Sequence, residues 1–104
     1  MTVTDGLWGG QLTTLQFDAV RHRCELHVAT TTHGTTIAYD IRCESVSELR
    51  FASAIAEPWD YAEVTEADLT TDEETGLMTM ELMLWSENAS LVITAASIQV
   101  IPAT

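Results

Sequence analysis

The chain has 104 residues, of which 46% are apolar, and its 16 acids against four arginines and no lysine give a net charge of −12. This length predicts a single domain, 1–104, and the apolar fraction excludes a disordered acidic tail. The negative charge repels nucleic acid and anionic lipid, and no apolar run approaches the ~20 residues of a membrane span. We therefore expect no nucleic acid and no membrane as partners. The start, MTVTDGLWGG, lacks the pattern of a signal peptide, which predicts a cytoplasmic location.

Apolar residues recur at every second position along most of the chain, which is typical of half-buried strands. In chain order, the alternating runs cover residues 14–19, 23–28, 37–43, 49–51 and 77–85. EPWDYAEV at 57–64 predicts a further strand, and LVITAASIQVI at 91–101 is apolar on both faces, as central strands are. The pattern predicts an all-β fold of about seven antiparallel strands, a meander that forms a sandwich or a small open barrel. At most one short helix is expected, in 47–56 or 61–69.

One hairpin can be predicted in detail. His33 and Gly34 form a two-residue turn in which the glycine can adopt the positive φ that such turns require. Residues whose numbers add up to 67 then face each other. The apolar face pairs Cys24 with Cys43, Leu26 with Ile41, and Val28 with Tyr39. The polar face pairs Arg23 with Glu44, Glu25 with Arg42, and His27 with Asp40. A shift of one residue would break both sets of pairs.

The predicted register also places the two cysteines opposite each other. Cys24 and Cys43 fall on a hydrogen-bonded pair, where the Cβ atoms are farther apart than at the intervening pairs. The sequence therefore favours two buried, reduced thiols over a disulfide, in agreement with a cytoplasmic protein.

No group of residues predicts catalysis or metal binding. His27 and Asp40 could orient an imidazole, but the sequence has no nucleophile elbow or glycine-rich oxyanion loop, and an exposed ion pair is the favoured interpretation. The histidines and cysteines lack the spacing of a zinc site, and the DEETG segment lacks the order of an EF-hand. We therefore expect a protein that is not an enzyme, with no cofactor and no metal.

The segment EPWDYAEVTEADLTTDEETG, residues 57–76, holds eight acids and no Lys or Arg. Trp59 and Tyr61 in this segment are either a plug for one end of the fold or an aromatic anchor inside an acidic rim, the pattern of a protein-binding hot spot. The acids serve either solubility or the attraction of a cationic partner. The candidate protein-binding residues are Glu57, Trp59, Asp60, Tyr61, Glu63, Glu66, Asp68, Asp72, Glu73 and Glu74.

Three stretches, LWGGQLTTLQFD, YDIRCESVSELRF and PWDYAEV, carry a resemblance in patterning to a class of known proteins. The chain resembles the small, acidic, all-β proteins that occur as bacterial immunity proteins or as cargo of mobile elements. The resemblance implies a dedicated binder that neutralises a toxin domain by covering its active surface, with residues 57–76 as the matching region.

The first functional hypothesis is therefore a non-enzymatic binding protein whose acidic face docks a basic protein partner. A second is a barrel or sandwich that binds an apolar small ligand lined by Met78, Met80, Leu82 and Tyr39. A third is a structural module that forms a homodimer through an edge strand, with residues 91–101 as the candidate edge.

Overall fold

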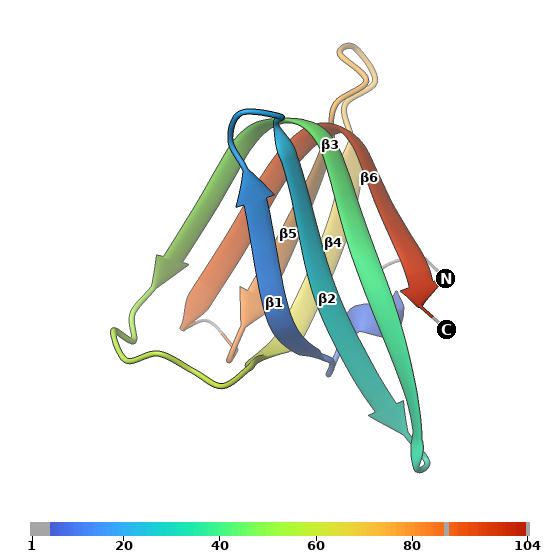
Figure 1. Ribbon diagram of the computed structural model, residues 1–104, viewed down its shortest axis with the longest axis vertical. Helices are drawn as coiled ribbons and strands as arrows, with labels where there is room; N and C mark the ends of the chain where they lie inside the picture. Colours follow the sequence, from blue (N-terminus) through green and yellow to red (C-terminus); the bar gives the residue numbers. More distant parts are fainter. Residues whose placement is uncertain (1–4, 87, 104) are drawn as a thin grey trace.

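The computed structural model describes residues 5–86 and 88–103 and confirms the all-β prediction (Figure 1). A short 3-10 helix, η1 (Asp5–Leu7), precedes six strands, and neither segment that could have formed a helix is helical. No helix among the described residues has the length and apolar character to cross a membrane. The strands are β1 (Gln11–Asp18), β2 (Arg23–Thr32), β3 (Thr35–Ser53), β4 (Ala62–Thr71), β5 (Met78–Leu84) and β6 (Ala89–Ala103).

The six strands form one antiparallel sheet that closes into a barrel in the order β1-β2-β3-β6-β5-β4. Two meanders, β1-β2-β3 and β4-β5-β6, are joined by the long pairing of β3 with β6. The closing pairing between β1 and β4 is short, because it involves only Gln11 opposite Glu63 and Leu12 opposite Ala62 among the described residues. The remainder of β1 is therefore paired on one side only.

The predicted β2–β3 hairpin is confirmed at every pair, from Arg23 opposite Glu44 to Thr32 opposite Thr35. Leu26, Val28 and Ile41 are fully buried, which shows why the register is strongly specified. On the outer face, Nδ1 of His27 lies 2.9 Å from a carboxylate oxygen of Asp40. This cross-strand contact joins the two residues that the register predicts to face each other, and both side chains are half-buried.

Cys24 and Cys43 are both free and buried, as predicted. The hydrogen bond between the two cysteine side chains and the burial of Cys43 raise the pKa of the Cys43 thiol, because both favour its neutral form. The same hydrogen bond lowers the pKa of Cys24, but that side chain is only 3% exposed. Reagents therefore cannot readily reach either sulfur in the folded protein.

The runs predicted as separate strands at 37–43 and 49–51 are one 19-residue strand, β3. The strand bends at Ser45, which has a φ of 55°, a left-handed conformation that is uncommon for residues other than glycine. Before the bend β3 pairs with both β2 and β6, and from Val46 onward it pairs with β6 alone. The amide of Val46 donates to the carbonyl of His22 at 2.8 Å, which fixes the point where β3 leaves β2.

The first half of β6 is central, as the two apolar faces of this segment predicted, whereas residues 97–103 pair with β3 alone among the described residues. Residues 89–95 pair with β5 on one side and with β3 on the other. This part of the strand has no free edge, so it is not available for an edge-to-edge homodimer.

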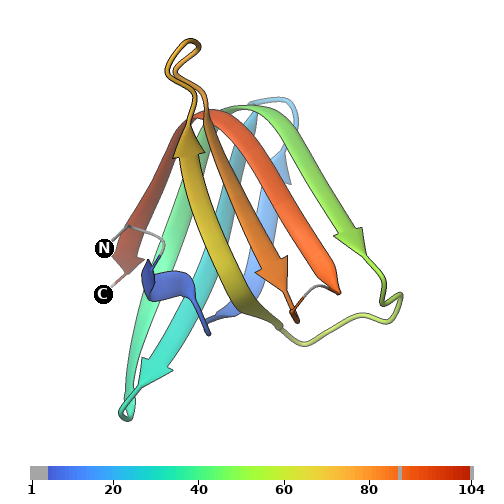
Figure 2. The ribbon, with the colours of Figure 1, turned by 180° about the vertical axis from the view of Figure 1, so that it is seen from behind.

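The interior is filled by side chains from all six strands and from η1, and Leu7 is fully buried. Figure 2 shows η1 between β4 and the β2–β3 hairpin. The indole Nε1 of Trp8 donates to the carbonyl of Ala67 on β4 at 3.1 Å. This contact holds η1 in place.

One facing pair on the outer surface is unfavourable. Asp68 on β4 lies directly opposite Glu81 on β5, and both side chains are exposed. Like charges at facing positions destabilise a sheet, so we expect Glu81→Lys to raise the free energy of unfolding by about 0.5–1 kcal/mol. Urea denaturation at low salt measures this change. Glu74→Lys makes the same change of charge in the exposed β4–β5 turn, and an equal gain there would contradict the facing-pair explanation.

Candidate functional site

The barrel has an open side between β1 and the second half of β3. The two strands lie close together at the β1–β2 turn, where Val46 is bonded to His22, and they diverge from that point (Figure 1). Residues 54–61 then run from the end of β3 to β4 below the opening. The result is a cleft that opens into the barrel, and we call it the apolar cleft. Its main cavity has a volume of about 280 Å³.

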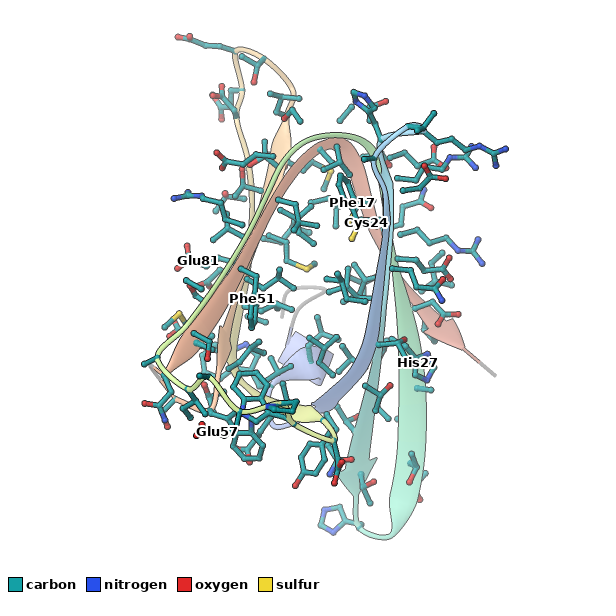
Figure 3. The ribbon with its side chains drawn as sticks, turned by 60° about the vertical axis from the view of Figure 1, so that its left-hand side comes forward. Phe17, Cys24, His27, Phe51, Glu57 and Glu81 are labelled. Carbon is teal, nitrogen blue, oxygen red and sulfur yellow. The ribbon has the colours of Figure 1, made fainter. Side chains whose placement is uncertain are left out.

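Side chains that point into the barrel line the apolar cleft. Leu15 and Phe17 on β1 lie opposite Leu26 and Cys24, which are buried, so they face the same interior. On the other wall, Leu49 and Phe51 of β3 lie opposite the buried residues Ile93 and Leu91. Figure 3 shows Phe17 and Phe51 on the inner sides of the two walls.

These inward-facing residues are nevertheless accessible to solvent. Phe51 is 57% exposed, Phe17 46% and Leu15 38%, although all three occupy core-facing positions of their strands. The reason is that no strand covers the opening between β1 and β3. Contiguous apolar side chains left in contact with water commonly mark a binding site.

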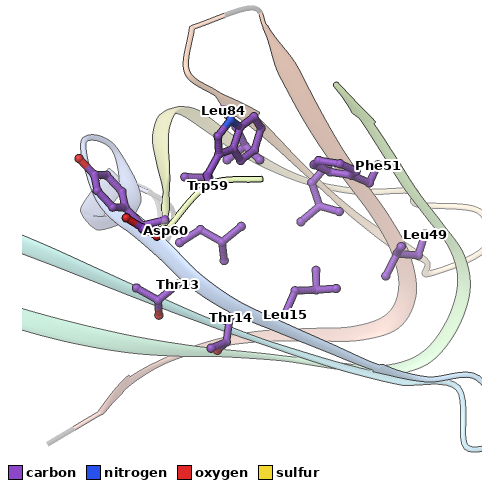
Figure 4. Close-up of a pocket in the computed structure, with 12 residues that line it drawn as sticks. Thr13, Thr14, Leu15, Leu49, Phe51, Trp59, Asp60 and Leu84 are labelled. Atoms are coloured by element: carbon purple, nitrogen blue, oxygen red, sulfur yellow. The ribbon is translucent and has the colours of Figure 1, made fainter. Parts of the chain in front are cut away.

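An aromatic group closes the lower end of the cleft (Figure 4). The ring centroids of Phe51 and Trp59 are 6.2 Å apart, those of Trp59 and Trp85 are 6.5 Å apart, and both pairs are close to edge-to-face. Tyr61 packs on Trp85 with the centroids 5.5 Å apart. Nε1 of Trp85 is buried without a hydrogen-bond partner among the described residues.

The cleft is apolar inside and acidic at its margins. A second hollow of about 260 Å³, which shares Leu49 with the main cavity, continues it towards the β1–β2 turn. Among the described residues that line the two hollows, Asp60 and Glu48 are acidic and none is Lys or Arg. The neighbouring Arg50 lies 3.5 Å from Glu48, so its charge is already partly balanced.

The predicted protein-binding residues are spread from one end of the barrel to the other. Trp59, Asp60 and Tyr61 line the apolar cleft, in a loop that also contains Glu57 and not in the strand predicted for this segment. Glu63 is the second residue of β4, and Glu66 and Asp68 lie exposed farther along this strand. Asp72, Glu73 and Glu74 form the β4–β5 turn at the opposite end of the molecule (Figure 1). The ten residues therefore extend along the barrel from the loop before β4, past the exposed side chains of this strand, to the β4–β5 turn.

Asp72 has a structural role in its turn. Its carboxylate accepts hydrogen bonds from the amides of Glu74 at 2.8 Å and Thr75 at 3.3 Å. Its carbonyl accepts the amide of Gly76, which has a φ of 75°. This arrangement explains an Asp at position 72 without a binding partner.

The cavity does not lie where the second hypothesis placed the ligand. Met80 and Leu82 are fully buried in the core, and the cavity lies elsewhere, among Leu15, Leu49, Phe51 and the loop aromatics. Within residues 5–86 and 88–103, no cluster of three or more His, Cys, Asp or Glu side chains could hold a metal ion.

Comparison with known proteins adds no relative. No protein-family model matches the sequence, and no curated protein matches it. The resemblance to immunity proteins therefore stays a prediction.

Proposed function

We propose that this protein is a non-enzymatic binding protein whose ligand site is the apolar cleft and whose partner is cationic. The observation that carries the proposal is the exposure of Leu15, Phe17 and Phe51 at positions that face the barrel interior. Apolar side chains that are exposed stabilise the protein less than the same side chains would if the barrel covered them. A bound apolar group would supply this missing stabilisation by covering them.

The charge of the molecule supports a cationic partner. The chain carries −12, and the cleft is bordered by Asp60 and Glu48. Complementary charge speeds the encounter and rejects partners of the same sign. The proposal retains the basic partner expected from sequence, but it moves the centre of the interface from the acidic strand β4 and its turn to the cleft beside Trp59.

Octylammonium and octanoate are suitable probes, because they share an apolar chain and differ in the sign of the charged group. We expect octylammonium to bind more tightly, as measured by tryptophan fluorescence and by NMR shifts of cleft residues, and this preference should decrease as salt is added. Phe51→Ser should weaken binding of octylammonium about tenfold, since it removes most of one wall.

Ile37→Ser is the matched control, because Ile37 is also an exposed apolar residue of β3 but does not line the cleft. Its affinity for octylammonium should equal that of the unmodified protein. Absence of octylammonium binding, or equal weakening by the two variants, would refute the cleft as the ligand site. A preference for octanoate would refute the cationic partner.

A further inference from the structure

The wall of the cleft formed by β3 has free backbone groups. The amide of Ala54 donates to the carbonyl of Asn88 at 2.8 Å, so residues 54 and 88 form a hydrogen-bonded pair of the β3–β6 ladder. Hydrogen-bonded and non-hydrogen-bonded pairs alternate along an antiparallel ladder. The register of β3 with β6 continues unchanged back to Glu48. The amide and carbonyl groups of Leu49, Phe51 and Ser53 therefore point away from β6, towards the opening.

The other wall of the opening is also a strand edge. Beyond Leu12, β1 pairs with β2 and, among the described residues, with no other strand. The opening thus lies between two free edges, both of which carry apolar side chains on their inner faces. A strand placed in the opening would find backbone hydrogen bonds and apolar contacts together.

The two edges lack several of the features that usually prevent pairing with another chain, although β3 carries the charged residues Glu48 and Arg50 on its outer face. Natural edge strands are protected by lysine, by proline, by bulges along the edge or by inward-pointing charges. Residues 48–53 and 14–18 contain no Lys and no Pro. The bulges of β3 and β1 lie before these segments, at Ser47 and Thr13, and leave the segments themselves regular.

We propose that an extended segment of a partner protein, with apolar and basic side chains in alternation, binds the cleft by adding as an antiparallel strand to residues 48–53 of β3. This inference rests on the proposed function and specifies its partner. Side chains of the added strand alternate between its two faces. Those on the inner face would meet Leu49 and Phe51, which requires apolar residues. Those on the outer face would lie beside Glu48 and Arg50, which are paired with each other, so the preference for basic residues comes from the net charge of −12.

Charge distinguishes this occupant from a second copy of the chain. Two copies would bring together two molecules of −12, and neither has a lysine to offset the repulsion. A basic segment instead complements the net charge of −12 and Asp60 at the margin of the cleft.

The test uses a peptide that alternates Val with Lys and matches the length of residues 48–53. A peptide of the same composition with its Val residues consecutive is the control for composition and charge. We expect the alternating peptide to bind at least about tenfold more tightly. Its binding should slow hydrogen exchange at the amides of Leu49 and Phe51, as measured by NMR.

Methylation of peptide amides tests the backbone pairing directly. Two methylated versions of the alternating peptide carry the methyl groups on one or the other alternate set of amides. Only one set faces β3, so one version should lose binding and the other should retain it. Strand addition is refuted if both versions bind as well as the unmethylated peptide, or if the exchange of the edge amides does not change.

A pair of variants at one position gives the same test from the side of the protein. Phe51→Ser removes the ring and keeps the amide, whereas Phe51→Pro removes both and is tolerable because this amide does not bond to β6. Peptide affinity should fall further in Phe51→Pro than in Phe51→Ser, and equal losses would contradict strand addition.

Other outcomes separate this inference from the proposed function. Binding of octylammonium without binding of the peptide would overturn strand addition and leave the cationic, apolar site intact. Failure of both probes would overturn both. A concentration-dependent dimer that protects the same amides without peptide would assign the edge to a second copy and overturn the inference.

Discussion

Leu7→Ala is expected to lower the free energy of unfolding by about 2–5 kcal/mol, which is a large share of the stability of a small domain. Leu7 lies in η1, a helix of only three residues, yet its side chain is fully buried in the barrel core. The helix lies between β4 and the β2–β3 hairpin (Figure 2). Truncation would leave a cavity between β-strands that cannot easily collapse. Urea denaturation followed by circular dichroism measures the loss.

Leu15→Ala is the matched control for this variant. It removes the same atoms from a residue that also faces the interior but is 38% exposed at the open side. Because much of Leu15 is already in water, its truncation should cost less than half as much as that of Leu7. Equal costs would mean that η1 is not a plug or that the open side is in fact closed.

The sequence predicts the strand pairings that are fixed locally and not those between distant segments. The β2–β3 hairpin was predictable pair by pair, because its two-residue turn fixes the register locally and both faces of the pairing agree. The long pairing of β3 with β6, such as Ile41 opposite Val100, has no such local signal. Alternation shows that both segments are strands but does not specify which strands are neighbours.

The bend at Ser45 was not predictable for a similar reason. The segment between the two predicted strands, ESVSE, contains no Gly or Pro, the residues that usually mark a change of direction. A serine with a φ of 55° is held there by the surrounding pairing, including the bond from Val46 to His22. The pattern therefore predicts two strands where the chain forms one bent strand.

The candidate site was predictable only in its loop. Trp59, Asp60 and Tyr61 are unusual enough in sequence to indicate an anchor, and all three line the cleft. Leu15 and Phe51 have the same alternating pattern as the buried Leu26, so sequence alone assigns them to the core. Their exposure depends on which neighbouring strand is missing, and this is a property of the assembled sheet.

Gly10→Ala is expected to destabilise the protein by about 1–3 kcal/mol, because the end of the barrel where β1 meets β4 has no space for a methyl group. A Cβ at Gly10 would lie 2.8 Å from methyl groups of both Val28 and Thr30 and 3.0 Å from the carbonyl oxygen of Leu7. Val and Thr are stiff at χ1, so their methyl groups cannot rotate away at low cost. The carbonyl of Gly10 also accepts the amide of Val64 at 2.8 Å, which prevents the backbone from shifting freely.

The adjacent glycine provides the control. Gly9 has a φ of 78°, and a methyl group added there would have no atom within 4 Å, so Gly9→Ala introduces backbone strain without a collision. This variant should lose about 1 kcal/mol of the free energy of unfolding. If steric closure is the dominant effect, Gly10→Ala should be the less stable variant in urea and should also speed hydrogen exchange at the Val64 amide. A Gly10→Ala protein as stable as the unmodified chain would show that Gly10 is not packed this closely against Val28 and Thr30 of β2.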